Sequence, residues 1–534
     1  MGGLIAESGG WVKMQSERHP VLILFLIVFA GIAIRVFTAL NTYVINPDGM
    51  EYIQQAKAIY YGDWHLLKSC LSFVSNYPFF IAGVYIFYSD WIIAARFVSV
   101  FFGSLTLFPL FFLIRRFTDE RTSCLCLLLY AVIPFLVSGS ADIIRDPVCW
   151  FFLVCGLYFS VTQLGMWETG WRRFLTLLAS YAFLLMAGWA RPEAFLVLIF
   201  SCCYTFLYSL FSKQKNYLLV SVSSLLLFGL FLASGAMILD PSFGNYSTGA
   251  FSKLSASLDT YRNLRQQLGA LSEGLDQGAL RSFLFKTTKF IWLVDVGLLV
   301  GSSIAAIFYP FIPFFVFGFF GLTVRLREDL RVLYLVILVI LGYVLLFVHV
   351  LQFWYFEHRF LYIAVFPACV LAAFGIAKIS LFTERKFRWK PAVGLVLIFL
   401  YVAGFGLGKN IKKRDKEKVI FREIAEYIST REHSPKKYVP VLTSDSSLMR
   451  LVPFYVNLGV QEGFCPTDSV KNLGNFEAIM EYATKHNVKY FLWNERHWSK
   501  TEIDIHGDQF RDTFVSQGHW FHAACGEIIL FHRD

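Results

Sequence analysis

Runs of about twenty apolar residues recur along this sequence, and they constrain its fold more than any other feature. A helix needs roughly 20 apolar residues to cross the hydrocarbon core of a bilayer, and about eleven runs meet this requirement. They lie near residues 20–40, 91–114, 123–138, 147–162, 174–189, 194–211, 217–238, 303–324, 332–350, 360–378 and 391–408. The composition, 56% hydrophobic and 16% charged, also differs from that of soluble domains. The chain is therefore predicted to be an all-α, multi-pass protein of the cell membrane.

Lysine and arginine are distributed unevenly between the connections. If the N-terminus is cytoplasmic, the cytoplasmic connections hold Arg115, Arg116, Arg121, Arg172, Arg173, Lys213, Lys215, Arg325, Arg327, Arg331, Lys378, Arg385, Lys386, Arg388 and Lys390. The positive-inside rule predicts this pattern. The opposite connections hold all the acidic motifs, which we expect on the extracytoplasmic side. The net charge of +10 thus reflects membrane topology, and we predict no nucleic-acid partner.

The composition changes after residue 408, which divides the chain into two predicted domains. Residues 1–408 form the transmembrane domain, with outer loops at 41–90 and 239–290. The stretch 285–325 could add an interfacial helix or a further crossing, giving about 12 or 13 spans. In 409–534, charged helical patterns alternate with strand patterns, which predicts a small soluble α/β domain. An odd number of spans places it outside, although the basic run at 409–418 argues for the cytoplasm.

Most of the 10 cysteines lie inside predicted spans, where Cys behaves as a small apolar residue. Cys465 and Cys525 share the α/β domain and could pair in an oxidising compartment, or remain free. His519 and His522 are expected on opposite faces of a strand, and we interpret them as structural.

The first outer loop begins with "NPDGMEY", which contains Asp48 and Glu51. A carboxylate beside a membrane is costly to desolvate and indicates a site, but Asp48 could instead cap a helix. Arg35, near the end of the preceding span, could belong to the same site or only extend its charge to the interface.

Three further connections on the same side resemble the first in composition. They contribute Asp142, Arg145 and Asp146 from "SADIIRDPVCW", Arg191 and Glu193 from "WARPEAF", and Glu357, His358 and Arg359 from "WYFEHRF". Arginine suits the binding of a phosphate, and a carboxylate suits proton removal from an attacking hydroxyl. Asp146 could alternatively serve only as a helix N-cap. Together these connections predict a pocket for an anionic substrate.

The order of these motifs resembles a known family. The segments "PDGMEYIQQAKAIYYGDW", "NYPFF", "RDP", "ARPE" and "HRFLYIAVFPACVLAAFGIA" are similar to those of the protein O-mannosyltransferase and aminoarabinose transferase superfamily. These GT-C membrane glycosyltransferases use polyprenyl-phosphate sugars. The resemblance covers residues 20–408, and the α/β tail resembles domains that follow the last span in bacterial members.

The resemblance implies a GT-C fold and a role for several residues. Asp48 matches the catalytic Asp of the first loop, Asp146 matches the second-loop Asp, and Arg359 with His358 matches the late-loop pair near the donor phosphate. Tyr77 stands where the aminoarabinose transferases carry a phosphate-contacting Lys, which argues against an aminoarabinose donor.

The implied reaction is an inverting transfer of a sugar from a polyprenyl-phosphate donor to a hydroxyl of a protein, lipid or glycan. Asp48 would be the base, and Glu51 would orient it or contact the acceptor. The residues expected to bind the donor phosphate are Arg359, His358, Arg145, Arg191 and Arg35. Asp48 and Asp146 could also hold a divalent metal, Mg or Mn. The alternative functions are a transporter or lipid-linked sugar flippase, and a non-catalytic scaffold.

Overall fold

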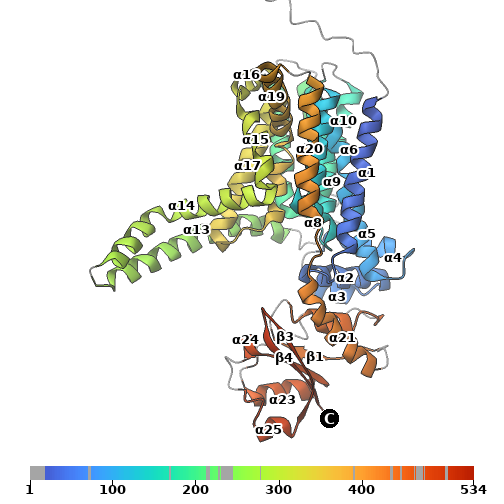
Figure 1. Cartoon of the computed structure of the whole chain (residues 1–534), viewed down its shortest axis with the longest axis vertical. Coiled ribbons are helices and arrows are strands. Elements are labelled where there is room, and N and C mark those ends of the chain that lie inside the picture. Colours follow the sequence, from blue (N-terminus) through green and yellow to red (C-terminus); the bar gives the residue numbers. More distant parts are fainter. Residues whose placement is uncertain are drawn as a thin grey trace, which may run out of the picture.

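The molecule is a bundle of upright helices with a helical arm and an α/β domain at one end (Figure 1). This computed structural model describes residues 19–69, 74–166, 170–211, 217–226, 229, 244–276, 278–388, 391–432, 437–444, 448–461, 464, 473, 475–498 and 503–533. We call the end that carries the arm and the α/β domain the outer end.

Eight helical segments in the described part of the chain are long and apolar enough to cross a membrane. They are α1 (His19–Leu40), α5 with α6 (Trp91–Leu105 and Leu107–Ile114), α9 (Asp146–Leu164), α10 (Trp171–Ala190), η1 with α11 (Pro192–Ala194 and Phe195–Phe211), α14 (Ala279–Ile307), α17 (Leu330–Phe353) and α20 (Pro391–Asn410). Counting each bent helix pair as one span raises the number in these residues to at most 11. The prediction of a helical, multi-pass membrane protein is confirmed.

Three predicted spans are not straight helices. The pairs are α7 with α8 (Glu120–Val132 and Pro134–Ala141), η3 and α15 with α16 (Tyr309–Phe311, Ile312–Phe319 and Leu322–Glu328), and η4 and α18 with α19 (His358–Leu361, Tyr362–Val365 and Cys369–Phe387). They bend by 56°, 57° and 74°. At the first bend, Pro134 has no N–H to continue the helix of the preceding turn. The predicted span at 217–238 overlaps a short apolar helix, Tyr217–Leu226, and most of its remainder lies outside the described residues.

Helices α15 and α19 pack with their backbones in contact. A Cβ atom on Gly375 would lie 1.6 Å from the carbonyl oxygen of Phe314, and one on Gly318 would lie 2.0 Å from that of Leu371. Only glycine fits at either position, and such small residues let membrane helices approach closely. This contact fixes α19 against α15. The 3-10 helix η4, which contains Arg359, precedes α19 in the same bent pair.

The predicted outer loop at 239–290 contains a helical hairpin instead of irregular chain. Helix α13 (Gly244–Glu273) and helix α14 (Ala279–Ile307) run antiparallel and project sideways from the outer end of the bundle (Figure 1). We call this hairpin the arm. The predicted span at 303–324 therefore begins as the end of α14 and continues only after the turn at η3.

The outer loop at 41–90 folds into three short helices below α1 and α5 (Figure 1). They are α2 (Pro47–Tyr61), α3 (Trp64–Ser69) and α4 (Tyr77–Tyr85). Helix α2 is almost entirely buried from Tyr52 to Ala58, because it lies between the bundle and the α/β domain.

The C-terminal segment forms the small α/β domain that the sequence predicts. Its elements are η5 (Lys416–Lys418), α21 (Val419–Arg431), β1 (Val441–Thr443), α22 (Leu451–Val456), α23 (Phe476–Lys485), β2 (Tyr490–Asn494), α24 (Glu495–Trp498), α25 (Asp508–Arg511), β3 (Phe514–His522) and β4 (Gly526–Arg533). The sheet has the order β1-β2-β4-β3, with β1 parallel to β2 and the other pairs antiparallel. His519 is exposed and His522 buried, as expected for opposite faces. Cys465, one half of the predicted disulfide, lies outside the described residues.

Candidate functional site

Asp48 meets Arg359 at the outer end of the bundle, although 311 residues separate them in sequence. Asp48 lies in the first turn of α2, whose N-cap residue is Asn46, so Asp48 is not the cap. Its carboxylate instead accepts a hydrogen bond from the Arg359 guanidinium, which also forms an ion pair with Glu357. The Asp48 side chain stays 43% exposed, so a substrate can reach it.

Asp146 forms a second ion pair, with Arg191, and this one is buried. The side chains are 1% and 4% exposed. Asp146 is the first residue of α9, which follows the N-cap Arg145, so it is not the cap either. Arg191 also lies 3.5 Å from the Glu193 carboxylate. Because charge this deep is costly unless it is paired, each partner depends strongly on the other.

The two ion pairs belong to one electrostatic cluster. The guanidinium carbon of Arg191 lies 4.6 Å from the centre of the Phe360 ring, and that of Arg359 lies 5.5 Å from the same ring. Arg359 interacts electrostatically with Asp146 as well as with Asp48. The cluster therefore combines side chains from four connections that the sequence places on one side of the membrane.

Tyr52 is a member of this cluster that the sequence reasoning missed. Burial raises the pKa of its hydroxyl to about 12, and the charges of Arg145, Asp48, Asp146 and Arg191 also act on it. Tyr52 follows Asp48 by one helical turn, so the i,i+4 spacing on α2 was the available signal.

Tyr77, which stands where the family resemblance predicts a lysine, packs against Tyr52. The two rings meet edge to face with their centres 5.3 Å apart. The Tyr77 hydroxyl is hydrogen-bonded to the Ala95 carbonyl at 3.0 Å and to the Ser99 hydroxyl at 2.8 Å. Tyr77 is therefore fixed in the interior and places an uncharged group beside the cluster.

The remaining predicted site residues lie at different distances from this cluster. Arg145 is close enough to act on the Tyr52 hydroxyl. Glu51 lies 3.5 Å from the Gln55 amide on the same helix as Asp48. His358 is exposed, and the centre of its ring lies 6.0 Å from that of Phe356. The roles proposed for these three side chains stay predictions.

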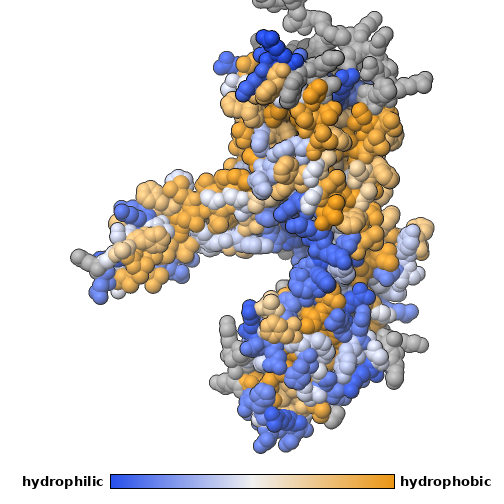
Figure 2. Space-filling view, viewed as in Figure 1, coloured by the Kyte–Doolittle hydropathy of each residue, from blue (hydrophilic) through white to orange (hydrophobic). Residues whose placement is uncertain are grey.

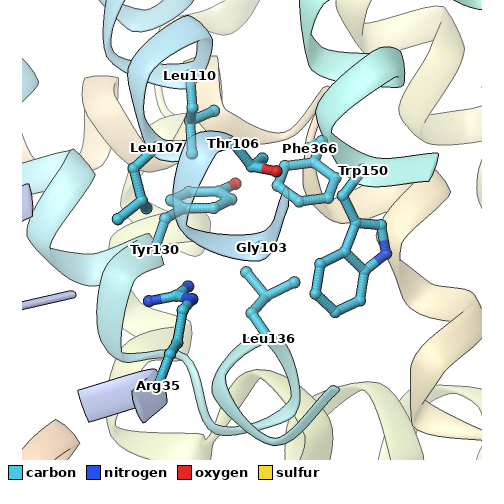
Figure 3. A pocket seen from close by; sticks show the side chains of 9 residues that line it. All are labelled: Arg35, Gly103, Thr106, Leu107, Leu110, Tyr130, Leu136, Trp150 and Phe366. Atoms are coloured by element: carbon cyan, nitrogen blue, oxygen red, sulfur yellow. The ribbon is translucent and has the colours of Figure 1, made fainter. Parts of the chain in front are cut away.

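Arg35 lies inside the bundle, where Figure 3 shows it with Tyr130, Leu136 and other residues around a cavity of about 10 Å³. Its guanidinium donates to the carbonyl oxygens of Gly31 and Ala131 and to the Ser140 hydroxyl. These contacts join α1 to α7 and α8. They explain a buried arginine without a substrate, and they do not support the predicted contact with a donor phosphate.

The residues present do not form an evident metal site. Within the described ranges, no three His, Cys, Asp or Glu side chains come together. Asp48 and Asp146, the two predicted ligands, are each paired with an arginine. A cation would have to compete with both guanidinium groups, so we derive no step that uses a metal.

The α/β domain holds α2 from its far side. Lys57 is fully buried and donates to the carbonyl oxygens of Leu458 and Val460, at 2.8 and 2.9 Å. The backbone N–H of Phe464 donates to the Gln54 side chain at 3.1 Å. We call these contacts the α2 clasp. It fixes the helix that carries Asp48.

One residue of the basic run at 409–418, Arg414, makes a second contact with the bundle. Arg414 forms an ion pair with Asp142 at 3.3 Å, and its backbone N–H donates to the Asn41 carbonyl oxygen. Arg414 thus binds the outer end of the bundle, where the α/β domain also lies.

The sequence matches no protein-family model and no curated protein, but its fold matches solved membrane proteins. The apo oligosaccharyltransferase of Archaeoglobus fulgidus superposes with a TM-score of 0.60 at 12% identity, covering 97% of this chain and 75% of that one. ArnT from Cupriavidus metallidurans gives 0.58 at 14% identity, covering 96% and 98%. ArnT bound to undecaprenyl phosphate gives 0.55 at 12% identity, covering 95% and 97%. The chain has the fold of the GT-C membrane glycosyltransferases, with a small α/β domain after the last span.

Proposed function

We propose that this protein transfers a sugar from a polyprenyl-phosphate donor to a hydroxyl acceptor at the outer face of the membrane. The observation that carries the proposal is the pairing of an accessible carboxylate, Asp48, with the Arg359 guanidinium at the level where the spans end. A lipid-anchored phosphate would arrive at this level, and the fold is shared with proteins solved with dolichol phosphate or undecaprenyl phosphate.

The proposed step is a single displacement with inversion. The acceptor hydroxyl oxygen forms a bond to the anomeric carbon, while the bond from that carbon to the donor phosphate oxygen breaks. Asp48 takes the hydroxyl proton, and polyprenyl phosphate leaves with the electron pair. The acceptor is a protein, lipid or glycan hydroxyl.

Arg359 has two functions in this scheme. Before the donor binds, its guanidinium neutralises Asp48. A phosphate offers stronger, bidentate acceptors to the same guanidinium, so donor binding draws Arg359 towards the leaving group and frees Asp48 for the proton. The arginine then stabilises the charge that develops on the phosphate as the bond breaks. Arg191, which pairs with the buried Asp146, lies over the Phe360 ring and fixes the loop next to Arg359.

Transport is the main competing function, and the placement of the charges disfavours it. Transporters commonly bind substrate near the bilayer midplane, between inverted repeats. Here the ion pairs lie in connections at one end of the bundle, and the sequence contains no evident repeat.

The test uses purified protein in nanodiscs with synthetic polyprenyl-phosphate sugars that differ in the sugar, together with a membrane extract that supplies hydroxyl acceptors. Mass spectrometry would follow the formation of free polyprenyl phosphate in the wild type and in an Asp48→Asn variant. We expect release with at least one donor in the wild type and almost none in the variant. In sealed proteoliposomes, movement of a fluorescent donor between leaflets without cleavage would contradict the transferase and favour a flippase.

A further inference from the structure

The arm exposes an unusual amount of apolar surface for a segment outside the bundle. The apolar side chains that α14 leaves exposed are Leu280, Phe283, Phe285, Phe290, Trp292, Leu293, Val294, Leu298, Val300 and Ile304. In α13, the described side chains from Asp259 to Glu273 are mostly polar. An apolar surface of this extent marks a contact with a partner or a membrane.

The apolar helix lies on the membrane side of the arm. Figure 1 shows α14 on the edge facing the spans and α13 on the edge facing the α/β domain. Figure 2 shows hydrophobic residues on the arm near the level where the apolar surface of the bundle begins. The exposed face of α14 is therefore continuous with the surface that the bundle presents to lipid.

A count of crossings argues against α14 as a span. Arg191 and Arg359 reach the same cluster from connections before α11 and after α17, so an even number of crossings must separate them. If the predicted span at 217–238, most of which lies outside the described residues, is taken as a crossing, then this span, α11, the bent pair of η3 and α15 with α16, and α17 give an even number. A crossing by α14 would put Arg359 on the opposite side from Asp48, with which it pairs.

Basic residues accompany the aromatic ones in the first half of α14. Arg281, Lys286 and Lys289 are exposed, and the Lys289 ammonium lies 4.5 Å from the centre of the Phe285 ring. Helices that combine basic and aromatic residues in this way lie in the plane of the interface, where the cations meet anionic headgroups. A break in helical geometry at Phe290 separates this half from the more apolar half near the bundle.

We infer that the arm lies flat on the outer leaflet, with α14 at the boundary between acyl chains and headgroups and α13 facing water. Its partner is a bilayer surface that contains anionic phospholipid. The bundle end of α14 packs against η4, the segment that carries Arg359. The leaflet therefore supports the Arg359 loop through the arm.

Depth-resolved photo-crosslinking of the full-length protein in nanodiscs tests this inference. One phospholipid carries a diazirine just below the headgroup, and a second carries it at the end of the acyl chain. We expect the shallow reagent to label peptides of α14 well above those of α13, and the deep reagent to label α17 but not α14. Strong deep labelling in the middle of α14 would show a crossing and overturn the inference. Absence of shallow labelling on α14 would also overturn it, and would indicate a protein partner on this face.

Matched charge variants test the lipid class. The wild type should label more strongly in phosphatidylglycerol nanodiscs than in phosphatidylcholine nanodiscs, and the variant Arg281→Gln/Lys286→Gln/Lys289→Gln should lose this excess while its labelling in phosphatidylcholine stays unchanged. The control Arg262→Gln/Arg265→Gln removes exposed cations from α13 and should change neither. Equal losses in the two variants would contradict a role for the α14 cations.

Discussion

In the proposed reaction, Asp48 accepts a proton while Arg359 is drawn away from it, and a substitution of Asp48 can test this chemistry without changing the fold. Asp48→Asn keeps the side-chain size, leaves the N-cap Asn46 unchanged and keeps an oxygen that Arg359 can bind. We expect normal folding and donor binding, with transfer reduced by about 10²–10⁴. Donor binding and turnover would be measured on the same preparation. Glu51→Gln, one turn away, is the control and should lose less; turnover near the wild-type level in Asp48→Asn would rule out the base.

Asp146 permits a different test, because its partner is buried with it. Asp146→Asn leaves the Arg191 charge without its main partner, and loss of one member of a buried pair costs about 3–5 kcal/mol. Loss of a helix cap would cost only about 1 kcal/mol. We therefore expect a clearly lower thermal unfolding midpoint in detergent for the single variant.

The double variant Asp146→Asn/Arg191→Met decides whether this pair has only a structural role. Without either charge, the midpoint should recover substantially, while transfer should stay low if the pair holds the Phe360 loop for catalysis. Recovery of both would remove Asp146 and Arg191 from the site. An unchanged midpoint in the single variant would contradict the buried pair itself.

At the level of single residues, the sequence indicated which charged residues could belong to the site, but not which side chains they contact. Asp48, Asp146, Arg191 and Arg359 could be selected because ionisable groups are rare beside spans. Tyr52 carries no charge, and in the sequence only its spacing of four residues from Asp48 pointed to the cluster. Arg35 satisfied the same criterion as the others, yet its hydrogen bonds run to the bundle interior, which no sequence pattern reveals.

Among the elements, α2 contains a buried lysine, Lys57, whose protonation can be tested by changing the pH. Burial lowers the pKa of Lys57 from 10.5 to about 8. Between these values the unfolded chain binds a proton that the folded chain has released, so the free energy of unfolding rises with pH, by up to about 3 kcal/mol. The neutral amine retains two N–H groups for the two carbonyl oxygens of the α2 clasp.

We therefore expect the unfolding midpoint of the wild type, relative to that of Lys57→Met, to rise as the pH is raised from about 8 to 10. Differential scanning fluorimetry at fixed salt would measure the difference. Lys412→Met, which removes an exposed lysine, is the control and should follow the wild type. If the midpoints of wild type and Lys57→Met change in parallel with pH, the lowered pKa of Lys57 is contradicted.

Elements with a simple period were the easiest to predict from the sequence. The helices and strands of the α/β domain match the patterns in 409–534, because its longer helices have one apolar face and its strands β1 and β2 are short buried runs. The bends in α7–α8, α15–α16 and α18–α19 were missed, since hydropathy measures the length of an apolar run and not its direction. The arm was assigned to a loop for a related reason: α13 is polar and α14 is apolar enough to be mistaken for part of a span.

For the whole molecule, we predict that the outer end faces the outside of the cell and that the opposite end faces the cytoplasm. Cysteine introduced at Glu273 at the end of α13, or at Lys485 in the α/β domain, should react with an impermeant maleimide in intact cells. Cysteine at Arg116 or Lys386, in the basic connections, should react only after permeabilisation. The unmodified protein measures background labelling. The reverse pattern would place the whole cluster in the cytoplasm and contradict transfer at the outer face.

The 311 residues between Asp48 and Arg359 also have a consequence for biosynthesis. At a translation rate of about 5–20 residues per second, roughly 15–60 s pass between synthesis of the first residue and of the second. During that interval the first outer loop is already synthesised, but Arg359, whose guanidinium we propose to hold the leaving phosphate, has not yet left the ribosome. Under the proposed mechanism, a chain stalled before Arg359 would therefore be unable to consume donor lipid.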